Sequence, residues 1–180
     1  MSRPPTSRER ILDAFESILI DDGERAATLE AVASRAEVSK GGLLYHFGSK
    51  DAMIDGLIDR LSARVNEDVA QIRAAEEGPI AYLLRTSVTS QSPFDRTIMA
   101  CLSLAHSAHD EVRSALRGMQ DAWFAVVREN VDDPVLARVI TLVSDGLYFN
   151  SVLRDGGQQI SADELDRLVG YLRASAAARG

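Results

Sequence analysis

Residues 28–50 of this 180-residue chain read TLEAVASRAEVSKGGLLYHFGSK, and this stretch decides the fold. Thr28 can cap a helix, because its hydroxyl can accept hydrogen bonds from the free amides of the first turn. Apolar residues then recur at spacings of three and four on one helical face, namely Leu29, Val32, Ala33 and Ala36. The stretch predicts two short helices joined by a tight turn, with a further helix starting near Lys50.

The second short helix opens at Ser39 in the same way. Its inward face is expected to hold Leu43, Leu44 and Phe47, which leaves Lys40, Gly41, Tyr45 and His46 free to face a partner. Two short helices packed at a steep angle present the second one to the major groove of DNA, while the first crosses the sugar-phosphate backbone. The stretch therefore predicts a helix-turn-helix module that reads DNA.

This segment resembles the TetR family of transcriptional regulators from about Ile11 to Met53, most specifically in the run from Ser39 to Lys50. The resemblance implies a DNA-binding domain over residues 1–50 and a ligand-binding and dimerisation domain over residues 51–180. The family usually carries Gly in the turn where this chain has Glu37. If that position needs a left-handed backbone, Glu costs on the order of 1 kcal/mol relative to Gly.

Composition indicates an ordinary globular protein, 46 % apolar and 26 % charged. The lone cysteine, Cys101, excludes an internal disulfide and is expected to be a small buried residue. Asp13 and Glu16 interrupt the apolar run near the N-terminus, so no signal peptide is predicted. No segment approaches the ~20 consecutive apolar residues of a membrane span. We therefore expect a cytoplasmic protein that does not bind membranes.

The net charge of −7 argues against a nucleic-acid partner, because phosphate binding needs local positive charge. The chain has two lysines, Lys40 and Lys50, and both fall in the predicted DNA-reading module. Residues 1–50 still hold seven basic and eight acidic side chains. Only a geometric segregation of charge can create a basic face, and the non-specific affinity for DNA should be modest and fall steeply with salt.

The pattern along the rest of the chain predicts an all-α fold of about nine helices, a three-helix head followed by six more. The fourth helix, over residues 50–73, would be about 36 Å long at 1.5 Å per residue and would connect the head to a second domain. The fifth helix is expected between the breaks at residues 77–79 and 92–93. The next three are expected over residues 93–106, 110–130 and 133–155, and the ninth begins at a capping box over Ser161–Glu164.

Eight residues are predicted to contact DNA: Thr28, Ser39, Lys40, Gly41, Gly42, Tyr45, His46 and Lys50. Lys40 could reach a guanine edge or a phosphate, and Lys50 could hold a phosphate beside a helix N-terminus. Each Gly costs on the order of 1 kcal/mol relative to Ala in a helix. Bare backbone that approaches the DNA closely would explain both glycines, and simple tolerance in a first turn is the alternative.

Seven residues of the second domain are candidates for an effector site: Met99, Leu102, Met119, Trp123, Asp145, Tyr148 and Phe149. Such side chains most often form plain core, but the family resemblance implies a ligand cavity that a small apolar or amphipathic molecule would fill. Asp145 could pair with an arginine, face solvent or act as the counter-charge of a cationic ligand. His106 and His109 have a spacing that could hold a metal, but this spacing is common by chance, so neither a metal nor a cofactor is predicted.

The resulting prediction is a DNA-binding transcriptional regulator, a repressor that a ligand releases from an inverted-repeat operator. One recognition helix reads few bases, so a homodimer is expected, and the resemblance places its interface on helices eight and nine. The alternatives are a helical adaptor or small-molecule-binding protein without DNA activity, and a helical enzyme. No catalytic residues are predicted, because no Gly-x-Ser-x-Gly motif, phosphate loop or carboxylate constellation stands out.

Overall fold

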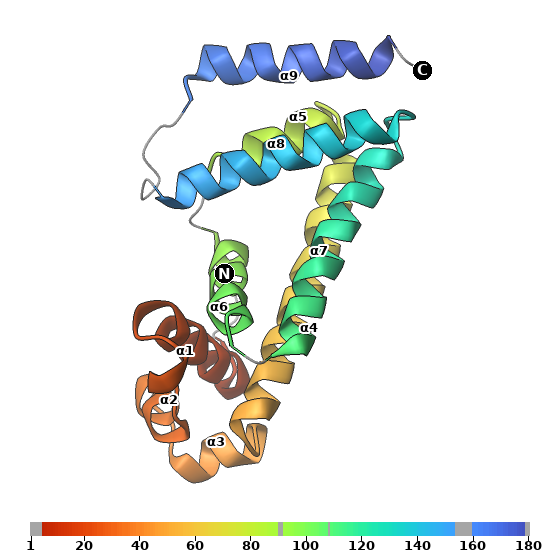
Figure 1. Ribbon diagram of the computed structural model, residues 1–180. Helices are drawn as coiled ribbons and strands as arrows, with labels where there is room; N and C mark the ends of the chain where they lie inside the picture. Colours follow the sequence, from red (N-terminus) through yellow and green to blue (C-terminus); the bar gives the residue numbers. More distant parts are fainter. Residues whose placement is uncertain (1–4, 90–91, 108, 154–159, 179–180) are drawn as a thin grey trace. The chain divides into compact units, whose positions relative to one another are not determined.

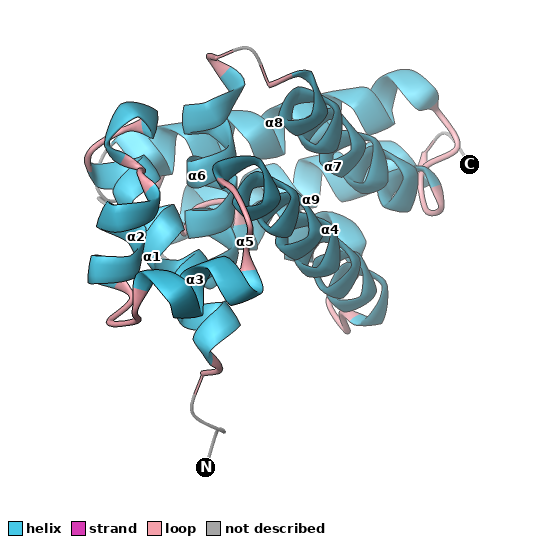
Figure 2. Cartoon of the chain, turned by 90° about the horizontal axis from the view of Figure 1, so that it is seen from below, coloured by secondary structure: helices cyan, strands magenta, loops and turns pink. Residues whose placement is uncertain are grey.

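A computed structural model describes residues 5–89, 92–107, 109–153 and 160–178. Within these ranges the chain is helical throughout and contains no strand (Figures 1 and 2), as the sequence predicts. The described residues form nine α-helices and one short 3-10 helix: α1 (Ser7–Asp21), η1 (Glu24–Ala26), α2 (Leu29–Arg35), α3 (Lys40–His46), α4 (Lys50–Ala74), α5 (Pro79–Thr86), α6 (Pro93–Ala105), α7 (Asp110–Arg128), α8 (Pro134–Leu153) and α9 (Ala162–Ala177).

The chain forms two compact units. Unit 1 comprises Met1–Arg64 and Pro93–Arg117, and unit 2 comprises Val65–Ser92 and Gly118–Gly180. α4 and α7 therefore each supply residues to both units. Unit 1 is larger than the expected head because α1 packs against α6, a contact between segments far apart in the sequence that local patterns do not reveal.

Unit 1 is built around α1, which packs against α2, α3 and α6. The apolar stripe predicted on α1 is its buried face, with Ile11, Leu12, Phe15, Ile18 and Leu19 at most 2 % exposed. Full burial of each such side chain contributes about 1.5–3 kcal/mol. This core fixes where the two short helices sit.

Side-chain caps begin the short helices, which are too short to be stable alone. Thr28 and Ser39 accept hydrogen bonds from Ala31 N and Gly42 N, and Ser49 accepts one from Ala52 N at the start of α4. The capping box of α9 joins Ser161 and Glu164. The caps at Thr28, Ser39 and Ser161 confirm the sequence predictions.

Unit 2 is built around α5, which packs against α8 and α9. A buried hydroxyl pair joins Ser87 and Ser144, with 2.8 Å between the two Oγ atoms. Arg73 of α4 pairs with Glu129 just after α7, through a hydrogen bond of 2.9 Å from Nε. Polar contacts therefore supplement the apolar packing of this unit.

α8 is the most apolar of the described helices. It has 20 residues and a mean hydropathy of 1.2, which by length and composition alone is enough to cross a membrane, although the same values occur in core helices of soluble proteins. A third of this span is buried. Its expected end at Gly156–Gly157 lies outside the described residues.

Candidate functional site

The second short helix, α3, is anchored through one face. Leu43 is fully buried and Phe47 is 2 % exposed, because residues four apart lie on the same side of a helix. Leu44 was expected to point inward too, but this prediction is wrong: its side chain is 41 % exposed. One residue turns a helix by about 100°, which carries Leu44 away from the face that Leu43 and Phe47 share.

The opposite face of α3 is open, as predicted. Lys40, Gly41, Tyr45 and His46 are all exposed, and the Tyr45 side chain is 86 % exposed. The rings of Tyr45 and His46 meet edge to face, with 5.1 Å between their centroids. Apart from the neighbouring residues and backbone of its own helix, no heavy atom of the described residues lies within 4 Å of the position that a Cβ at Gly41 would occupy. A partner could thus approach the backbone of the first turn directly.

The two N-caps and the turn between the helices complete this surface. Thr28 and Ser39 are exposed, and Gly42 is half-buried with its N–H donating to Ser39 Oγ over 3.0 Å. In the turn, Glu37 has φ = +54°. The expectation that this position needs a left-handed backbone is therefore confirmed, and Glu is strained there.

Both lysines of the module are already engaged by glutamates. Lys40 Nζ lies 2.6 Å from Glu30 Oε1, and this hydrogen bond lowers the pKa of Glu30. Lys50 Nζ donates to the main-chain oxygen of Glu24 over 2.8 Å and lies 3.4 Å from its Oε1. A phosphate would have to share each ammonium group with its carboxylate.

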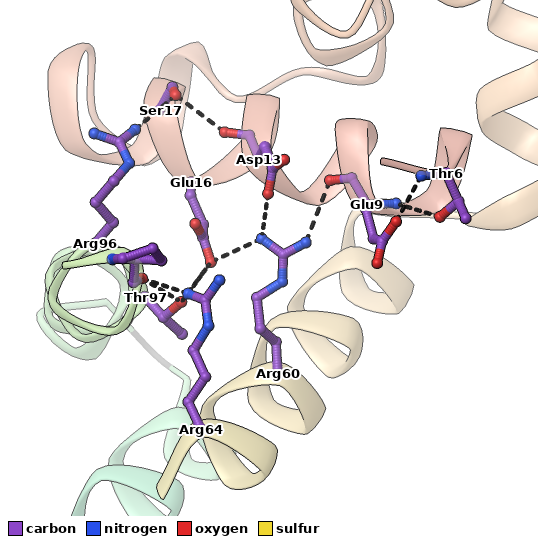
Figure 3. Close-up of polar contacts among 10 residues, drawn as sticks. Thr6, Glu9, Asp13, Glu16, Ser17, Arg60, Arg64, Arg96 and Thr97 are labelled. Atoms are coloured by element: carbon purple, nitrogen blue, oxygen red, sulfur yellow. Dashed lines mark hydrogen bonds and ion pairs between the residues drawn. The ribbon is translucent and has the colours of Figure 1, made fainter. Parts of the chain in front are cut away.

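A buried carboxylate ties α1 to α4 and α6 within unit 1 (Figure 3). Glu16 is 3 % exposed, and its Oε1 lies 3.1 Å from Nη1 of Arg60 and 3.6 Å from Nη1 of Arg64. Arg60 also pairs with Asp13 at 2.7 Å, and Arg64 donates to the hydroxyl of Thr97. This network fixes α1, against which α2 and α3 pack, on α4 and α6.

Unit 2 contains a small pocket of about 110 Å³. Helices α5, α7 and α8 supply its lining, which combines one aromatic ring, two apolar side chains and several polar groups: Leu83, Gln120, Trp123, Arg138, Thr141, Leu142, Ser144 and Asp145. Trp123 and Asp145 belong to the predicted effector site. The other six were missed, although those on α8 precede Asp145 within two helical turns.

Five of the predicted effector residues lie outside this lining. Met99 and Leu102 are half-buried on α6, which belongs to unit 1. On the helices of unit 2, Met119 is buried in the core, Tyr148 is half-buried and Phe149 is 55 % exposed. Of the seven predicted residues, Trp123 and Asp145 line this pocket.

The pocket pairs opposite charges with an aromatic surface. Burial raises the pKa of Asp145, and the positive charge of Arg138 opposes this shift. The guanidinium of Arg138 also lies over the ring of Phe124, 4.0 Å from its centroid. Trp123 donates from Nε1 to the Asp68 carboxylate of α4 over 2.8 Å. A ligand that displaced Trp123 would thus act directly on α4.

The two histidines that flank the connection from α6 to α7 have separate partners. His106 Nδ1 is 2.9 Å from the carbonyl oxygen of Leu102, whereas His109 Nε2 is 3.0 Å from Glu24 Oε1. Among the described residues, no group of three or more His, Cys, Asp or Glu side chains could hold a metal. Cys101 is fully buried, which raises its pKa to about 12, as expected of a packing residue.

Comparisons with known proteins agree with this arrangement. Residues 11–57 match the model of the bacterial regulatory proteins of the tetR family, and residues 77–177 match that of the tetracyclin repressor-like C-terminal domain. The transcriptional regulator BetI of Rhizobium meliloti is 26 % identical over 95 % of this chain and 92 % of its own length.

Two solved structures share the fold. Salmonella enterica GusR has a TM-score of 0.68 at 19 % identity, with 98 % of each chain covered. The multidrug binding protein EbrR, complexed with malachite green, has a TM-score of 0.64 at 22 % identity, with 97 % of this chain and 98 % of EbrR covered. The described helices therefore follow a known helix-turn-helix architecture.

Proposed function

The chain belongs to the TetR family of DNA-binding transcriptional regulators, and on that premise we propose that it is a repressor that a small effector releases from an inverted-repeat operator. The observation that carries this proposal is the open face of α3. Its exposed side chains stand on a helix whose other face is sealed in the core, and this gives a rigid surface for the major groove.

In the proposed complex, the residues of this face divide into two roles. Lys40, Tyr45 and His46 reach base edges or phosphates from α3, and Gly41 and Gly42 let the backbone come close. The N-cap hydroxyls of Thr28 and Ser39 and the ammonium group of Lys50 contact phosphates, which fixes the register of the module on the duplex.

We propose a homodimer through α8 and α9. The exposed side chains of Val135, Val139, Leu142, Phe149 and Leu153 are spaced as alternating steps of three and four along α8, with Gly146 at the one remaining step. This is the spacing of a helix-pairing seam, and a small residue in it lets two helix backbones approach. Exposed Tyr171 supports a contribution from α9. The apolarity of α8 then serves two faces, one in the core and one for the partner copy.

The effector that we propose is a small amphipathic molecule whose polar head enters the pocket of unit 2. The pocket of about 110 Å³ is smaller than a 150 Å³ cavity that takes benzene, so a larger body would require widening. Arg138 and Asp145 suit a head group with an anionic centre, a cationic centre or both, and Trp123 offers a flat surface to the body.

Release follows from the contact between Trp123 and Asp68. Effector binding against Trp123 would shift α4, which begins at Lys50 in the DNA-reading module. A 100-fold loss of operator affinity needs about 2.7 kcal/mol of differential effector affinity between the two states. We propose binding, not catalysis, as the activity, and the cytoplasm as the place where the protein meets DNA.

The experiment begins with selection of a binding site from a random pool of duplexes by the full-length protein. The selected duplex should contain an inverted repeat, and the affinity should fall steeply as the salt concentration rises. Lys50→Ala should weaken binding to all sequences and reduce the salt slope by about one ion, whereas Tyr45→Ala should also relax sequence preference. Unchanged affinity in both variants would overturn the assignment of α3, and a protein that selects no duplex would support the adaptor alternative.

Trp123 is the single tryptophan of the chain, so its fluorescence reports directly on the pocket. Malachite green, bound by EbrR, and amphipathic compounds with a carboxylate, an ammonium group or both are the first probes. A true effector should change the emission of Trp123 and release the selected duplex at the same concentration. Arg138→Gln and Asp145→Asn should weaken both effects, whereas Glu67→Gln on the exposed side of α4 should leave both unchanged.

A further inference from the structure

Three side chains of unit 1 meet at the carboxylate of Glu24 in η1. His109 Nε2, just before α7, lies 3.0 Å from Oε1, and Lys50 Nζ, at the start of α4, lies 3.4 Å from the same oxygen. Ser107, in the connection between α6 and α7, also donates a hydrogen bond to this carboxylate. The cluster joins a predicted phosphate contact, Lys50, to an imidazole that the proposed function does not use.

The cluster is shielded enough for its charges to interact. The side chains of His109, Glu24 and Lys50 are 19 %, 24 % and 32 % exposed. The hydrogen bond from His109, followed by that from Ser107 and the charge of Lys50, lowers the pKa of Glu24 to about 2. The hydrogen bond to Glu24 raises the pKa of His109. Glu24 is therefore anionic near neutral pH, and the pKa of His109 lies above its ordinary value of 6.5.

The remaining charged groups around His109 lie on α7. Glu111 Oε1 is 3.3 Å from Nδ1 and also favours the protonated ring. Asp110 is paired with Arg113, whose guanidinium donates to the carbonyl oxygens of Ala105 and Ser107. The local charges that face the imidazole are thus the two glutamates and, across Glu24, Lys50.

The protonation state of His109 determines how much of the positive charge of Lys50 is available to a phosphate. When His109 is neutral, the carboxylate of Glu24 offsets Lys50; when His109 is protonated, it offsets Glu24 and leaves Lys50 uncompensated. An ammonium group has three N–H donors, and one of them donates to the main-chain oxygen of Glu24, so a phosphate oxygen can still accept a hydrogen bond from Lys50. Phosphate binding and protonation of His109 should therefore reinforce each other.

We propose that His109 is a positioning residue for DNA binding: acting through Glu24, its protonation strengthens the hold of Lys50 on a phosphate. The inference rests on the proposed function, because it takes Lys50 as a phosphate contact. A residue outside the helix-turn-helix then contributes to DNA affinity, and the protein takes up a proton when it binds DNA.

The test measures affinity for the selected duplex by fluorescence anisotropy between about pH 6 and pH 8.5 at constant ionic strength. All proteins carry His46→Gln, which removes the histidine on the exposed face of α3. The parent should bind roughly three- to tenfold more tightly at the acidic end than at the alkaline end. The affinity of His109→Gln should not vary with pH and should equal the weaker, alkaline value of the parent. The affinity of Glu24→Gln should not vary with pH either, but should equal the tighter, acidic value of the parent.

Lys50→Ala separates the inference from the proposed function. In the Lys50→Ala background, His109→Gln should change affinity less than about 1.5-fold at every pH, because the coupling runs through Lys50. An unaltered pH profile in His109→Gln, or an equal effect with and without Lys50, would overturn the role of His109 while leaving the phosphate contact intact. If Lys50→Ala itself binds the duplex as tightly as the parent does, Lys50 does not contact a phosphate, and both proposals fail. Thermal melts confirm that each variant is folded, and the opposite directions for His109→Gln and Glu24→Gln cannot arise from a common loss of structure.

Discussion

The hydroxyl of Thr97 on α6 donates a 2.6 Å hydrogen bond to the carboxylate of Glu16 on α1, 81 positions earlier in the chain. Both residues are buried, and the same carboxylate faces Arg60 and Arg64 of α4. An anion in this environment is stable only while its donors are in place. The attachment of α1 to α4 and α6 therefore includes a polar contact inside an apolar core.

Thr97→Val should lower the free energy of unfolding by about 1–2 kcal/mol, because it keeps the shape of the side chain but removes a donor from a buried carboxylate. Urea denaturation monitored by circular dichroism measures this change. Thr97→Ser retains the hydroxyl and should retain most of the stability. A larger loss in Thr97→Ser than in Thr97→Val would show that the methyl group, not the hydrogen bond, stabilises this contact.

The sequence predicted what local patterns encode. The caps at Thr28 and Ser39 and the stripe of α1 depend only on residues within a turn or two, so spacing and capping chemistry were sufficient. The exposed face of α3 was found in the same way, apart from Leu44. Leu44 was assigned to the inward face because it is apolar, although its direction around the helix differs from that of Leu43 and Phe47.

The sequence did not reveal what depends on distant contacts. Glu16 was interpreted only as a break in an apolar run, because its burial follows from Arg60, Arg64 and Thr97. The effector residues were chosen by size and aromaticity, whereas the pocket is lined by residues such as Arg138 that share a helical face with Asp145. Choosing between faces requires knowing which helices pack together.

Glu37→Gly should stabilise the protein by up to about 1 kcal/mol, because Gly adopts the φ of +54° without the steric penalty that Glu pays. The loss of chain entropy on folding offsets part of this gain. Glu37→Ala keeps a Cβ and should leave the stability nearly unchanged. The midpoints of thermal unfolding compare the three proteins, and a stabilising Ala together with a neutral Gly would refute the role of the backbone conformation.

Stability should depend on pH through Glu24 and His109, with opposite signs. The depressed pKa of Glu24 gives a contribution that is present above its ordinary pKa of 4.5 and is lost as the pH falls towards 2. The raised pKa of His109 gives a contribution that is present below 6.5 and is lost as the pH rises through the folded-state value. His109→Gln should therefore cost about 0.5–1 kcal/mol near pH 6 and less near pH 9, measured by urea denaturation. A cost that does not vary with pH would contradict the ion pair.

Leu153→Glu should dissociate the proposed dimer, because it places a charge in the apolar seam of α8, where Leu153 is 80 % exposed in the single chain. Sedimentation equilibrium should give the mass of one chain for the variant and of two chains for the wild type. Glu67→Lys changes the charge of an exposed residue outside the seam and should leave the dimer intact. A dimer that survives Leu153→Glu and Phe149→Glu together would exclude α8 as the interface.

Gly41→Ala should raise stability and weaken DNA binding at the same time. Nothing lies within 4 Å of the added Cβ, so the fold gains helix propensity of up to about 1 kcal/mol. In the complex the same methyl group would hold α3 away from the duplex, and at least a tenfold loss of affinity is expected if the backbone approaches closely, about 1.4 kcal/mol.

Gly118→Ala on α7 is the matched control for this pair of effects. Its Cβ also meets nothing within 4 Å, so it should stabilise the protein similarly while leaving affinity for the duplex unchanged. Gly56→Ala differs from both, because its Cβ would lie 2.8 Å from the Phe47 ring, and overpacking there should cost about 1–3 kcal/mol. Thermal melts measure the stability of each variant, and anisotropy titrations on the same preparations measure its affinity for the duplex. If Gly41→Ala binds DNA as tightly as Gly118→Ala does, close approach at Gly41 is refuted, and Gly41 is merely tolerated in the first turn of α3.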